Sequence, residues 1–345
     1  MKLGRRITRY LFFIIIIIIA IRMNKITALS SVKMQKNSCP RDWPGLRVRF
    51  LAFDFDSTCT VEDTTGLYYK ATETYRRASE AKSKVLDKEW ESLGNTYLKG
   101  HKETIKRLLE NVPYSENGNL SMEGLKSFLM ETHNFDSECT KKVEASGLLS
   151  GISKEGIIQI AKNVQLSPGC VQVLGQVNLP LNVISFNWSK DLIQIVLGQL
   201  KHLRIAGNNF PTEDNKSTGQ IDSHVSTSFD KEAEFMRLVE GQKEIEGLSV
   251  FIGDSIGDLL PLLKADVGIV IGNSNTMRKV AKAFGIKLLP LLDLYNRYGR
   301  CNSVQYDSSI VIPSTTDNNG ILYEATSWYE IGELLLGNRL LPVTD

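Results

Sequence analysis

Two pairs of aspartates are the residues of this sequence that could together bind a metal ion and perform acid–base chemistry. Asp54 and Asp56 follow one apolar run, and Asp254 and Asp258 follow another. Side chains two residues apart on a strand point the same way, and the second pair can converge across a strand-to-helix turn. Such like charges are costly unless a cation neutralises them, and carboxylate oxygens suit Mg²⁺. The two pairs therefore predict an Mg²⁺ site.

Two further polar residues lie between these pairs. Ser185 ends the apolar run Val183–Ile184, and its hydroxyl could bind a phosphate oxygen. Lys231 opens a helical pattern, where the helix dipole opposes a positive charge, and this mildly favours a functional role. Taken alone, each signal has a structural alternative: solvated acids at a strand end, acids that complement a helix dipole, a structural Ser and a surface Lys.

The elements that would position these residues alternate between strand and helix patterns. Short apolar, β-branched and aromatic runs indicate buried strands, and stripes around Phe235 and Leu259–Leu263 indicate helices. Alternation of this kind predicts an α/β fold with a parallel sheet covered by helices on both faces. The expected strands are Val48–Phe53, Leu181–Ser185, Ser249–Gly253, Val267–Ile271 and Ile286–Leu289.

Residues 65–164 differ from the rest, because they contain helical stripes and no convincing strand. One stripe runs through Trp90, Leu93 and Tyr97 at spacings of three and seven, and others begin at Ile105 and Leu125. We expect an all-helical insertion after the first strand. The predicted organisation is a leader at 1–41, a core at 42–64 and 165–345, and a helical cap at 65–164.

In sequence order, the acid pair, hydroxyl, lysine and second acid pair resemble the motifs of the haloacid-dehalogenase phosphatase superfamily. The resemblance implies a Rossmann-like core with a cap and a phosphoric monoester hydrolase. It further implies Asp54 as nucleophile, Asp56 as general acid and base, and Ser185 and Lys231 as phosphate ligands. The implied Mg²⁺ ligands are Asp54, the Asp56 backbone carbonyl, Asp254 and Asp258.

A narrower resemblance covers most of residues 50–337 and includes Phe53–Val61, Ser217–Ile221, Ile252–Leu260 and Ser327–Trp328. These segments resemble the phosphatase half of the plant bifunctional thiamine-biosynthesis proteins, which fuse a thiaminase-II-like enzyme to a thiamine monophosphate phosphatase. The resemblance implies thiamine monophosphate as substrate. The alternatives are another small ester, such as pyridoxal phosphate, a nucleotide or a sugar phosphate, or a non-catalytic protein that binds phosphorylated ligands.

Substrate choice is expected in the cap and beside the motifs. A thiazolium is a cation, so aromatic faces or carboxylates could attract it. The candidates are Trp188 foremost, Tyr68, Glu62 and Asp63, and then Tyr69, Trp90 and Tyr97. Trp90 and Tyr97 also lie on the helical stripe, which favours a place in the cap core.

Composition and charge exclude several classes of protein and of binding partner. The 345 residues are 42% hydrophobic and 23% charged, which excludes a wholly disordered or fibrous chain. Five scattered cysteines without CxxC spacing argue against a disulfide scaffold or zinc site. Residues 1–49 hold eleven Lys/Arg and one acid, which leaves 30 basic and 38 acidic residues in the remainder. An acidic body disfavours nucleic acid as partner, and the oligomeric state stays open.

The basic head contains one apolar run, Leu11–Ile21, which is too short for a stable membrane span. It suits a secretory signal or an anchor-like segment, and an organellar transit peptide or a translation start at Met23 or Met34 are alternatives. We expect the catalytic body in the cytosol or in an organelle such as a mitochondrion or plastid.

Overall fold

The central element of the fold is a seven-stranded, wholly parallel sheet with strand order β4-β3-β1-β7-β8-β10-β9. The computed structural model describes residues 45–112, 120–298 and 320–337, so the predicted leader lies outside the described residues. The strands are β1 (Val48–Phe53), β3 (Leu181–Ile184), β4 (Leu203–Ala206), β7 (Leu248–Gly253), β8 (Val267–Ile271), β9 (Lys287–Pro290) and β10 (Ile321–Ala325).

Both faces of the sheet are buried. Along β1, Leu51 and Phe53 join one apolar cluster while Phe50 and Ala52 join the other, as the two-residue period of a strand requires. Helices α6, α7, α11 and α12 contribute to the first cluster, and α8, α9 and α10 contribute to the second. Their bounds are α6 (Cys170–Leu174), α7 (Lys190–Leu197), α8 (Ser228–Glu240), α9 (Leu259–Lys264), α10 (Asn275–Ala283), α11 (Leu291–Tyr298) and α12 (Trp328–Leu336).

This architecture confirms the predicted α/β class with a parallel sheet. All five expected strands form, with bounds that shift by at most a residue. Strands β4 and β10 were not expected from the pattern. β4 is four residues long and carries Arg204, and β10 carries Glu324, which bonds to Arg278 outside the sheet. A charged residue in so short a segment hides the apolar run.

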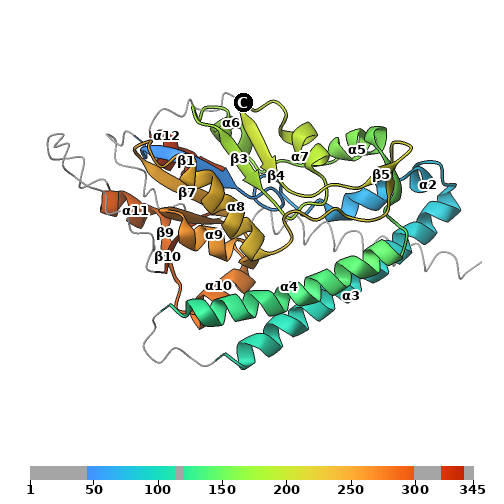
Figure 1. The fold of residues 1–345 in the computed structure, drawn as a ribbon, viewed down its shortest axis with the longest axis horizontal. Helices are drawn as coiled ribbons and strands as arrows, with labels where there is room; N and C mark the ends of the chain where they lie inside the picture. The colour runs from blue at the N-terminus through green and yellow to red at the C-terminus, as the bar shows by residue number, and fades with distance from the viewer. Residues whose placement is uncertain (1–44, 113–119, 299–319, 338–345) are drawn as a thin grey trace, which may run out of the picture. The chain divides into compact units, whose positions relative to one another are not determined.

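The segment after β1 forms the expected helical insertion, dominated by two long helices that pack side by side as a hairpin (Figure 1). Ser79 caps the first of them by accepting a hydrogen bond from Lys82 N. The helices are η1 (Thr65–Ala71), α2 (Glu73–Arg76), α3 (Glu80–Glu110), α4 (Met122–Ala145) and α5 (Lys154–Ala161). The domain limits 65–164 stay a prediction.

The insertion is not entirely helical, which corrects one expectation. Strand β2 (Ser150–Ser153) lies within residues 65–164 and pairs antiparallel with β6 (Lys216–Thr218), which also pairs with β5 (Thr212–Glu213). Ser217 Oγ accepts a hydrogen bond from Ile152 N across this small sheet. A four-residue strand of Ser, Gly and Ile has no alternation to reveal it, and its pairing partner lies more than 60 residues away.

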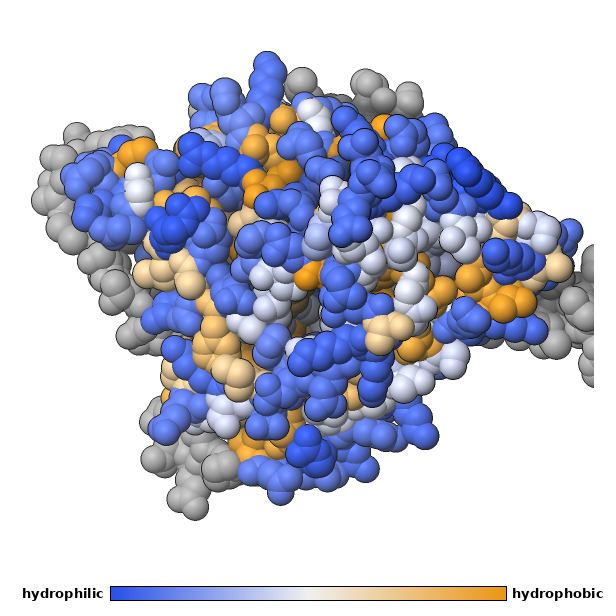
Figure 2. Space-filling model, turned by 45° about the vertical axis from the view of Figure 1, so that its right-hand side comes forward, coloured by the Kyte–Doolittle hydropathy of each residue, from blue (hydrophilic) through white to orange (hydrophobic). Residues whose placement is uncertain are grey.

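Figure 2 shows a face of the molecule on which hydrophilic residues predominate and apolar residues form separate small patches. The aliphatic and aromatic side chains are instead concentrated in three buried clusters. None of the described helices has both the length and the apolar character needed to cross a membrane.

Candidate active site

Three carboxylates converge at the carboxyl edge of the sheet. Asp54 directly follows β1, and Asp254 and Asp258 follow β7, the neighbour of β1 in the sheet. Each of the three offers an oxygen, and these oxygens all lie within 4.8 Å of one another. Parallel strands end at the same edge, so two motifs that are 200 residues apart in sequence form one cluster.

A buried lysine joins two of these carboxylates. Lys231 Nζ lies 2.7 Å from Asp258 Oδ1 and 3.0 Å from Asp54 Oδ1, and its side chain has no exposed surface. The ammonium also lies 4.2 Å from the centroid of the Phe186 ring. Burial alone would lower the pKa of Lys231, but the carboxylates of Asp258 and Asp54 raise it well above its usual value. Lys231 therefore stays protonated and supplies one fixed positive charge.

Asp258 is held by hydrogen bonds to both of its carboxylate oxygens. Oδ1 accepts from Lys231, and Oδ2 accepts from Ser255 N and Ser255 Oγ, which caps the short helix η2 (Ile256–Asp258). A Cβ at Gly253 would lie 2.5 Å from Asp258 Cγ, so glycine is needed at the end of β7 for this carboxylate to fit. Both oxygens are thus engaged, and Asp258 orients Lys231.

Asp56 is held by a separate hydrogen-bond network on the other side of Asp54. Its Oδ1 accepts from Thr64 N at 2.8 Å and Thr64 Oγ1 at 2.7 Å, and its Oδ2 accepts from Asn187 Nδ2 at 2.7 Å. Asn187 Oδ1 in turn accepts from the hydroxyl of the fully buried Tyr68 and from Ser189 N. These bonds fix the orientation of the Asp56 carboxyl group and of the amide that contacts it.

The loop that follows β1 is fixed by contacts with distant residues. Ser57 has a positive φ of 55°, and its N–H donates to Thr60 Oγ1, which stabilises a conformation that is unusual for a non-glycine residue. Thr58 Oγ1 donates to Asp254 Oδ1 at 3.2 Å. The fully buried Trp328, at the start of α12, donates from Nε1 to the Thr58 carbonyl at 2.8 Å. The loop is therefore tied to both β7 and the last described helix.

Three acids of the site have raised pKa values. Burial is the main cause for each, and it raises the pKa of Asp54 to about 6, of Asp56 to about 7 and of Asp254 to about 8. The Asp258 carboxylate adds to the rise at Asp54 and Asp254, whereas Lys231 counteracts it. A carboxylic acid with a pKa near neutrality can both donate and accept a proton, as a general acid–base catalyst must.

The charges at the sheet edge fit a divalent cation. When ionised, Asp54, Asp254 and Asp258 carry three negative charges, and Lys231 supplies one positive charge, which leaves two negative charges uncompensated. Asp54 Oδ1 is buried, and the Lys231 ammonium lies 3.0 Å from it. Hard oxygen ligands in this number suit Mg²⁺. Asp54, Asp254 and Asp258 each offer an oxygen to such an ion, and Asp258 also holds Lys231 beside it.

The structure brings all six predicted motif residues to one edge. Ser185 follows β3, which also neighbours β1, and its buried Oγ accepts a hydrogen bond from Asn187 N at 3.2 Å. Lys231, expected as a phosphate ligand, contacts carboxylates on two sides, so its positioning of Asp54 is an additional role. The six residues are Asp54, Asp56, Ser185, Lys231, Asp254 and Asp258.

The four proposed substrate residues are in different environments. Glu62 and Asp63 are exposed, and Asp63 Oδ1 accepts from Thr65 N at the start of η1. Tyr68 is fully buried and stacks on the half-buried Trp188 at a centroid distance of 5.9 Å. The Tyr68 ring is thus inside the protein, where it acts on Asp56 through Asn187.

Asn187 and Thr64 are site residues to which the sequence analysis gave no role. Asn187 had a signal, since it lies two residues after Ser185 at the same strand end and so at the same edge of the sheet. Thr64 had none, because an isolated threonine in a polar segment is unremarkable. Its importance follows only from the fold, which returns the chain to Asp56 eight residues later.

The comparison with curated proteins confirms the sequence resemblance to the plant bifunctional thiamine-biosynthesis proteins. The chain is 29% identical over 306 residues to "Bifunctional TH2 protein, mitochondrial" of Arabidopsis thaliana. The match covers 82% of this chain and 48% of that protein, so the chain spans about half the length of the curated relative. No known family profile matches the chain.

Solved structures with a similar arrangement include three hydrolases. A phospho-aspartyl intermediate analogue of phosphoserine phosphatase is 17% identical, with 68% of this chain and 91% of that chain covered and a TM-score of 0.43. An HAD family hydrolase from Salmonella enterica serovar Typhi is 16% identical, with coverages of 68% and 66% and a TM-score of 0.44. Cytosolic 5′-nucleotidase IIIB bound to cytidine is 18% identical, with coverages of 68% and 78% and a TM-score of 0.42.

Proposed function

We propose that this protein is an Mg²⁺-dependent phosphomonoesterase of the haloacid-dehalogenase type that works through an aspartyl-phosphate. The observation that carries the proposal is the convergence of Asp54, Asp254 and Asp258 within 4.8 Å, with Lys231 between two of them and Asp56 on the same loop. Phosphoryl transfer asks a protein mainly for positioning and charge neutralisation, and this edge of the sheet offers both.

In the first step, an Asp54 oxygen attacks phosphorus and the ester P–O bond breaks. Asp56, whose pKa is raised to about 7, donates its proton to the departing alkoxide. In the second step, Asp56 takes a proton from water, the water oxygen attacks phosphorus and the bond to Asp54 breaks. Ser185 and Lys231 donate to phosphate oxygens, and Lys231 also holds Asp54 in place.

Asp54, the Asp56 backbone carbonyl, Asp254 and Asp258 would hold the Mg²⁺ ion, and Asp258 also orients Lys231. When bound, the ion supplies positive charge that offsets the phosphate and the ionised carboxylates. Thr58 contributes by donating a hydrogen bond to Asp254, which leaves the second oxygen of that carboxylate available.

As substrate we propose thiamine monophosphate. The support is the 29% identity to a protein that is named as a bifunctional TH2 protein, together with the motif-flanking segments that resemble the thiamine-biosynthesis phosphatases. The substrate would be a small phosphorylated metabolite in either case, since the site is built around one phosphoryl group.

The test is a panel of phosphate esters at equal concentration, with Mg²⁺ or EDTA, using protein that begins near Met34. Phosphate release from thiamine monophosphate should exceed release from pyridoxal phosphate, nucleotides and sugar phosphates. Asp54→Asn should lower kcat by about 10³-fold or more on every ester, because the amide cannot replace the nucleophile. The matched control is Asp222→Asn, which neutralises an exposed carboxylate and should leave kcat unchanged.

Equal rates across the panel would reject the substrate and keep the reaction class. Absence of Mg²⁺-stimulated hydrolysis of every ester would reject the enzyme and favour the alternative of a protein that binds phosphorylated ligands. Against that alternative stands the presence of all four acids and of the lysine, each held in a defined orientation.

We also propose that the catalytic body works in the cytosol or in an organelle, with residues 1–41 as its targeting segment. The support is the basic, apolar composition of this leader. A fluorescent protein fused to residues 1–41 should localise differently from the fluorescent protein alone, and an identical distribution would reject a targeting role.

A further inference from the structure

The α3–α4 hairpin is attached to the rest of the protein at two places. Near the start of α3, Trp90 stacks on Tyr69 of η1 at a centroid distance of 5.0 Å. Near the other end, Ile105 joins the cluster beneath the sheet, where Phe128 of α4 packs on Phe284 at 5.3 Å. The middle of the hairpin bridges these two attachments.

The middle of the hairpin carries a further cluster of aromatic rings. Tyr97 and Phe135 stack at a centroid distance of 5.9 Å, and His101 lies 5.4 Å from Tyr97 and 6.3 Å from Phe135. All three are half-buried. Tyr97 and His101 continue the α3 stripe that runs from Trp90 to Ile105, so they face the same side as the attachments.

A glycine allows the two helices to approach here. A Cβ at Gly100 would lie 2.7 Å from Phe135 Cζ, so a larger residue would displace the ring. Tyr97 and Phe135 stack on each other and are half-buried, so a planar ligand would meet their outer faces and edges.

A carboxylate lies within this cluster without a positive partner. Asp136 Oδ1 is buried and accepts no hydrogen bond from the described residues, and none of the described lysines or arginines forms an ion pair with Asp136. Burial raises the pKa of Asp136 to about 6, which a hydrogen bond from Tyr97 only partly offsets. Burial lowers the pKa of His101, so its imidazole is neutral at pH 7 and does not compensate the charge.

The same cluster is linked to the catalytic loop. Trp90, seven residues before Tyr97 on α3, stacks on Tyr69 of η1. Tyr68, the residue before Tyr69, donates to Asn187 Oδ1, and the Asn187 amide donates to Asp56 Oδ2. The α3 stripe that carries Tyr97 thus begins beside the residues that orient Asp56.

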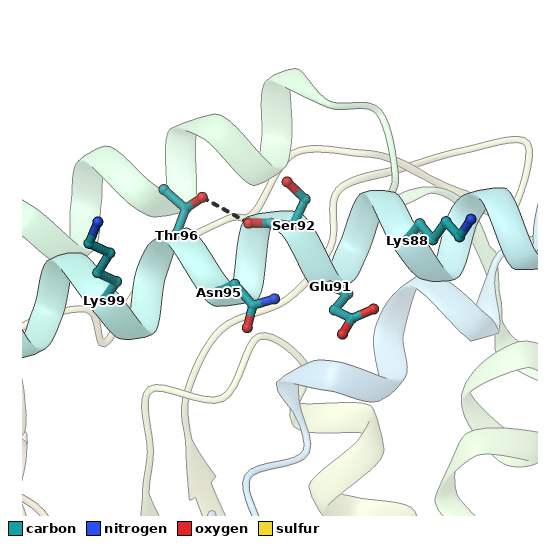
Figure 3. Close-up of a pocket in the computed structure, with 6 residues that line it drawn as sticks. All are labelled: Lys88, Glu91, Ser92, Asn95, Thr96 and Lys99. Atoms are coloured by element: carbon teal, nitrogen blue, oxygen red, sulfur yellow. Dashed lines mark hydrogen bonds between the residues drawn. The ribbon is translucent and has the colours of Figure 1, made fainter. Parts of the chain in front are cut away.

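The surface depression on α3 lies away from this aromatic cluster. Figure 3 shows a depression lined by side chains of this one helix, all of them exposed. At 3.6 residues per turn these side chains lie on the opposite side of α3 from Trp90 and Tyr97. They offer no aromatic ring, so we assign no ligand to them. They are Lys88, Glu91, Ser92, Asn95, Thr96 and Lys99.

We propose that Tyr97, His101, Phe135 and Asp136 form the subsite for a flat, positively charged leaving group, with the rings against its faces and the Asp136 carboxylate against its charge. The inference rests on the proposed phosphatase function and deepens it, because it assigns the recognition of an organic cation such as a thiazolium to named cap residues. Aromatic faces and a desolvated carboxylate both attract cations.

The test compares Asp136→Asn with wild type on two esters of similar shape, thiamine monophosphate and a neutral arylalkyl phosphate. The amide keeps the size of the side chain and its acceptor for Tyr97 but removes the charge. KM for the cationic ester should rise by about tenfold or more with little change in kcat, while both constants for the neutral ester stay unchanged. Glu131→Gln, which neutralises an exposed carboxylate of the same helix, should change neither.

A second readout does not depend on catalysis. Calorimetry with free thiamine should detect binding to wild type and to Glu131→Gln and at least about tenfold weaker binding to Asp136→Asn. If Asp136→Asn does not fold, Phe135→Leu should raise KM for the cationic ester alone by roughly threefold to tenfold. Equal effects on both esters, or no effect on either, would overturn the subsite. If no ester is hydrolysed but thiamine binding depends on Asp136, the phosphatase proposal fails and the subsite stands.

Discussion

The carboxyl edge of the sheet and the middle of the α3–α4 hairpin both hold buried carboxylates, but their hydrogen bonding differs. At the edge, Asp258 has both oxygens engaged, by Lys231 and by Ser255. In the hairpin, Asp136 keeps one buried oxygen that accepts no hydrogen bond from the described residues, and, unlike Asp54, it forms no ion pair with a described lysine or arginine. A buried acceptor without a partner is costly, so an incomplete site in an otherwise packed hairpin points to a ligand.

This difference in hydrogen bonding indicates that the sheet edge and the hairpin have different functions. The sheet edge is built from strands that pair throughout, and its charged groups are oriented before any substrate arrives. The hairpin is attached at its two ends and is only half-buried between them. A preorganised edge suits the transfer of a phosphoryl group, whereas the hairpin can vary its middle residues without disturbing that edge.

The strongest test of the edge is Asp56→Asn, which keeps the backbone carbonyl and removes the exchangeable proton. Alkyl phosphates need a proton on their leaving group, so kcat should fall by about 10²–10⁴-fold. Aryl phosphates leave readily as phenolates, so their loss should be much smaller. Parallel assays of the two ester classes with this variant measure the difference. Equal losses would assign Asp56 a structural role.

The comparison predicts that the charges of the edge depend on one another. Lys231→Met leaves Asp54 and Asp258 without their shared cation, which should lower the free energy of unfolding by about 3–5 kcal/mol. Lys231→Met combined with Asp258→Asn should recover much of that stability without recovering activity. Denaturant unfolding measures both. A double variant as unstable as the single one would show that the loss reflects packing instead of charge.

Metal binding should stabilise the edge more at high pH than at low pH. Burial raises the pKa of Asp54 to about 6 and of Asp254 to about 8, so between pH 4 and 8 the folded apo protein binds more protons than the unfolded chain. Its unfolding free energy therefore falls as pH rises. Mg²⁺ binds the ionised carboxylates and should add about 2.7 kcal/mol at a hundredfold excess over Kd.

Thermal unfolding with Mg²⁺ or EDTA at pH 5.5 and pH 8 checks this prediction, and the larger Tm difference should occur at pH 8. Asp254→Asn should abolish the difference, while Asp136→Asn should retain it because the hairpin carboxylate does not contact the metal site. A Tm difference of the same size at both pH values would contradict the raised pKa values.

The smallest predicted effect concerns two glycines of α3. Gly94 has no atom within 4 Å of the position of an added Cβ, whereas at Gly100 that Cβ would lie 2.7 Å from the Phe135 ring. Gly94→Ala should raise the unfolding free energy by about 0.5–1 kcal/mol, because alanine favours helix. In Gly100→Ala, the displacement of the Phe135 ring should cancel this gain in unfolding free energy. Equal stabilisation of both variants, measured by chemical denaturation, would show that Phe135 moves freely.

Much of the fold and most of the site could be predicted because the signals are local. Apolar runs mark β1, β3, β7 and β8, and each motif acid or hydroxyl follows such a run directly. Once the sheet is parallel, the ends of neighbouring strands must meet. That reasoning placed Asp54, Ser185 and Asp254 at one edge without any knowledge of strand order.

The parts of the fold and of the site that were not predicted depend on contacts that no local sequence pattern encodes. Asn187 reaches Asp56 across 131 residues of sequence, and Lys231 reaches Asp258 across 27. The antiparallel pair of β2 and β6 joins segments of four and three residues, respectively, which are too short to show a period. Tyr68 seemed suited to a substrate by its type and position, but its hydroxyl is used inside the protein.

The hydrogen bond between Trp328 and the Thr58 carbonyl can form only late in the synthesis of the chain. The loop that carries Asp54 is made early, but the indole that completes its surroundings follows 270 residues later. At a ribosome rate of about 5–20 residues per second, this interval lasts roughly 15–50 s. Strand β1 pairs with β3 and β7, so it gains its first partner only after nearly half of that interval and its second still later. A nascent chain of this design should depend on chaperones, and catalytic competence should arise only when α12 has left the ribosome.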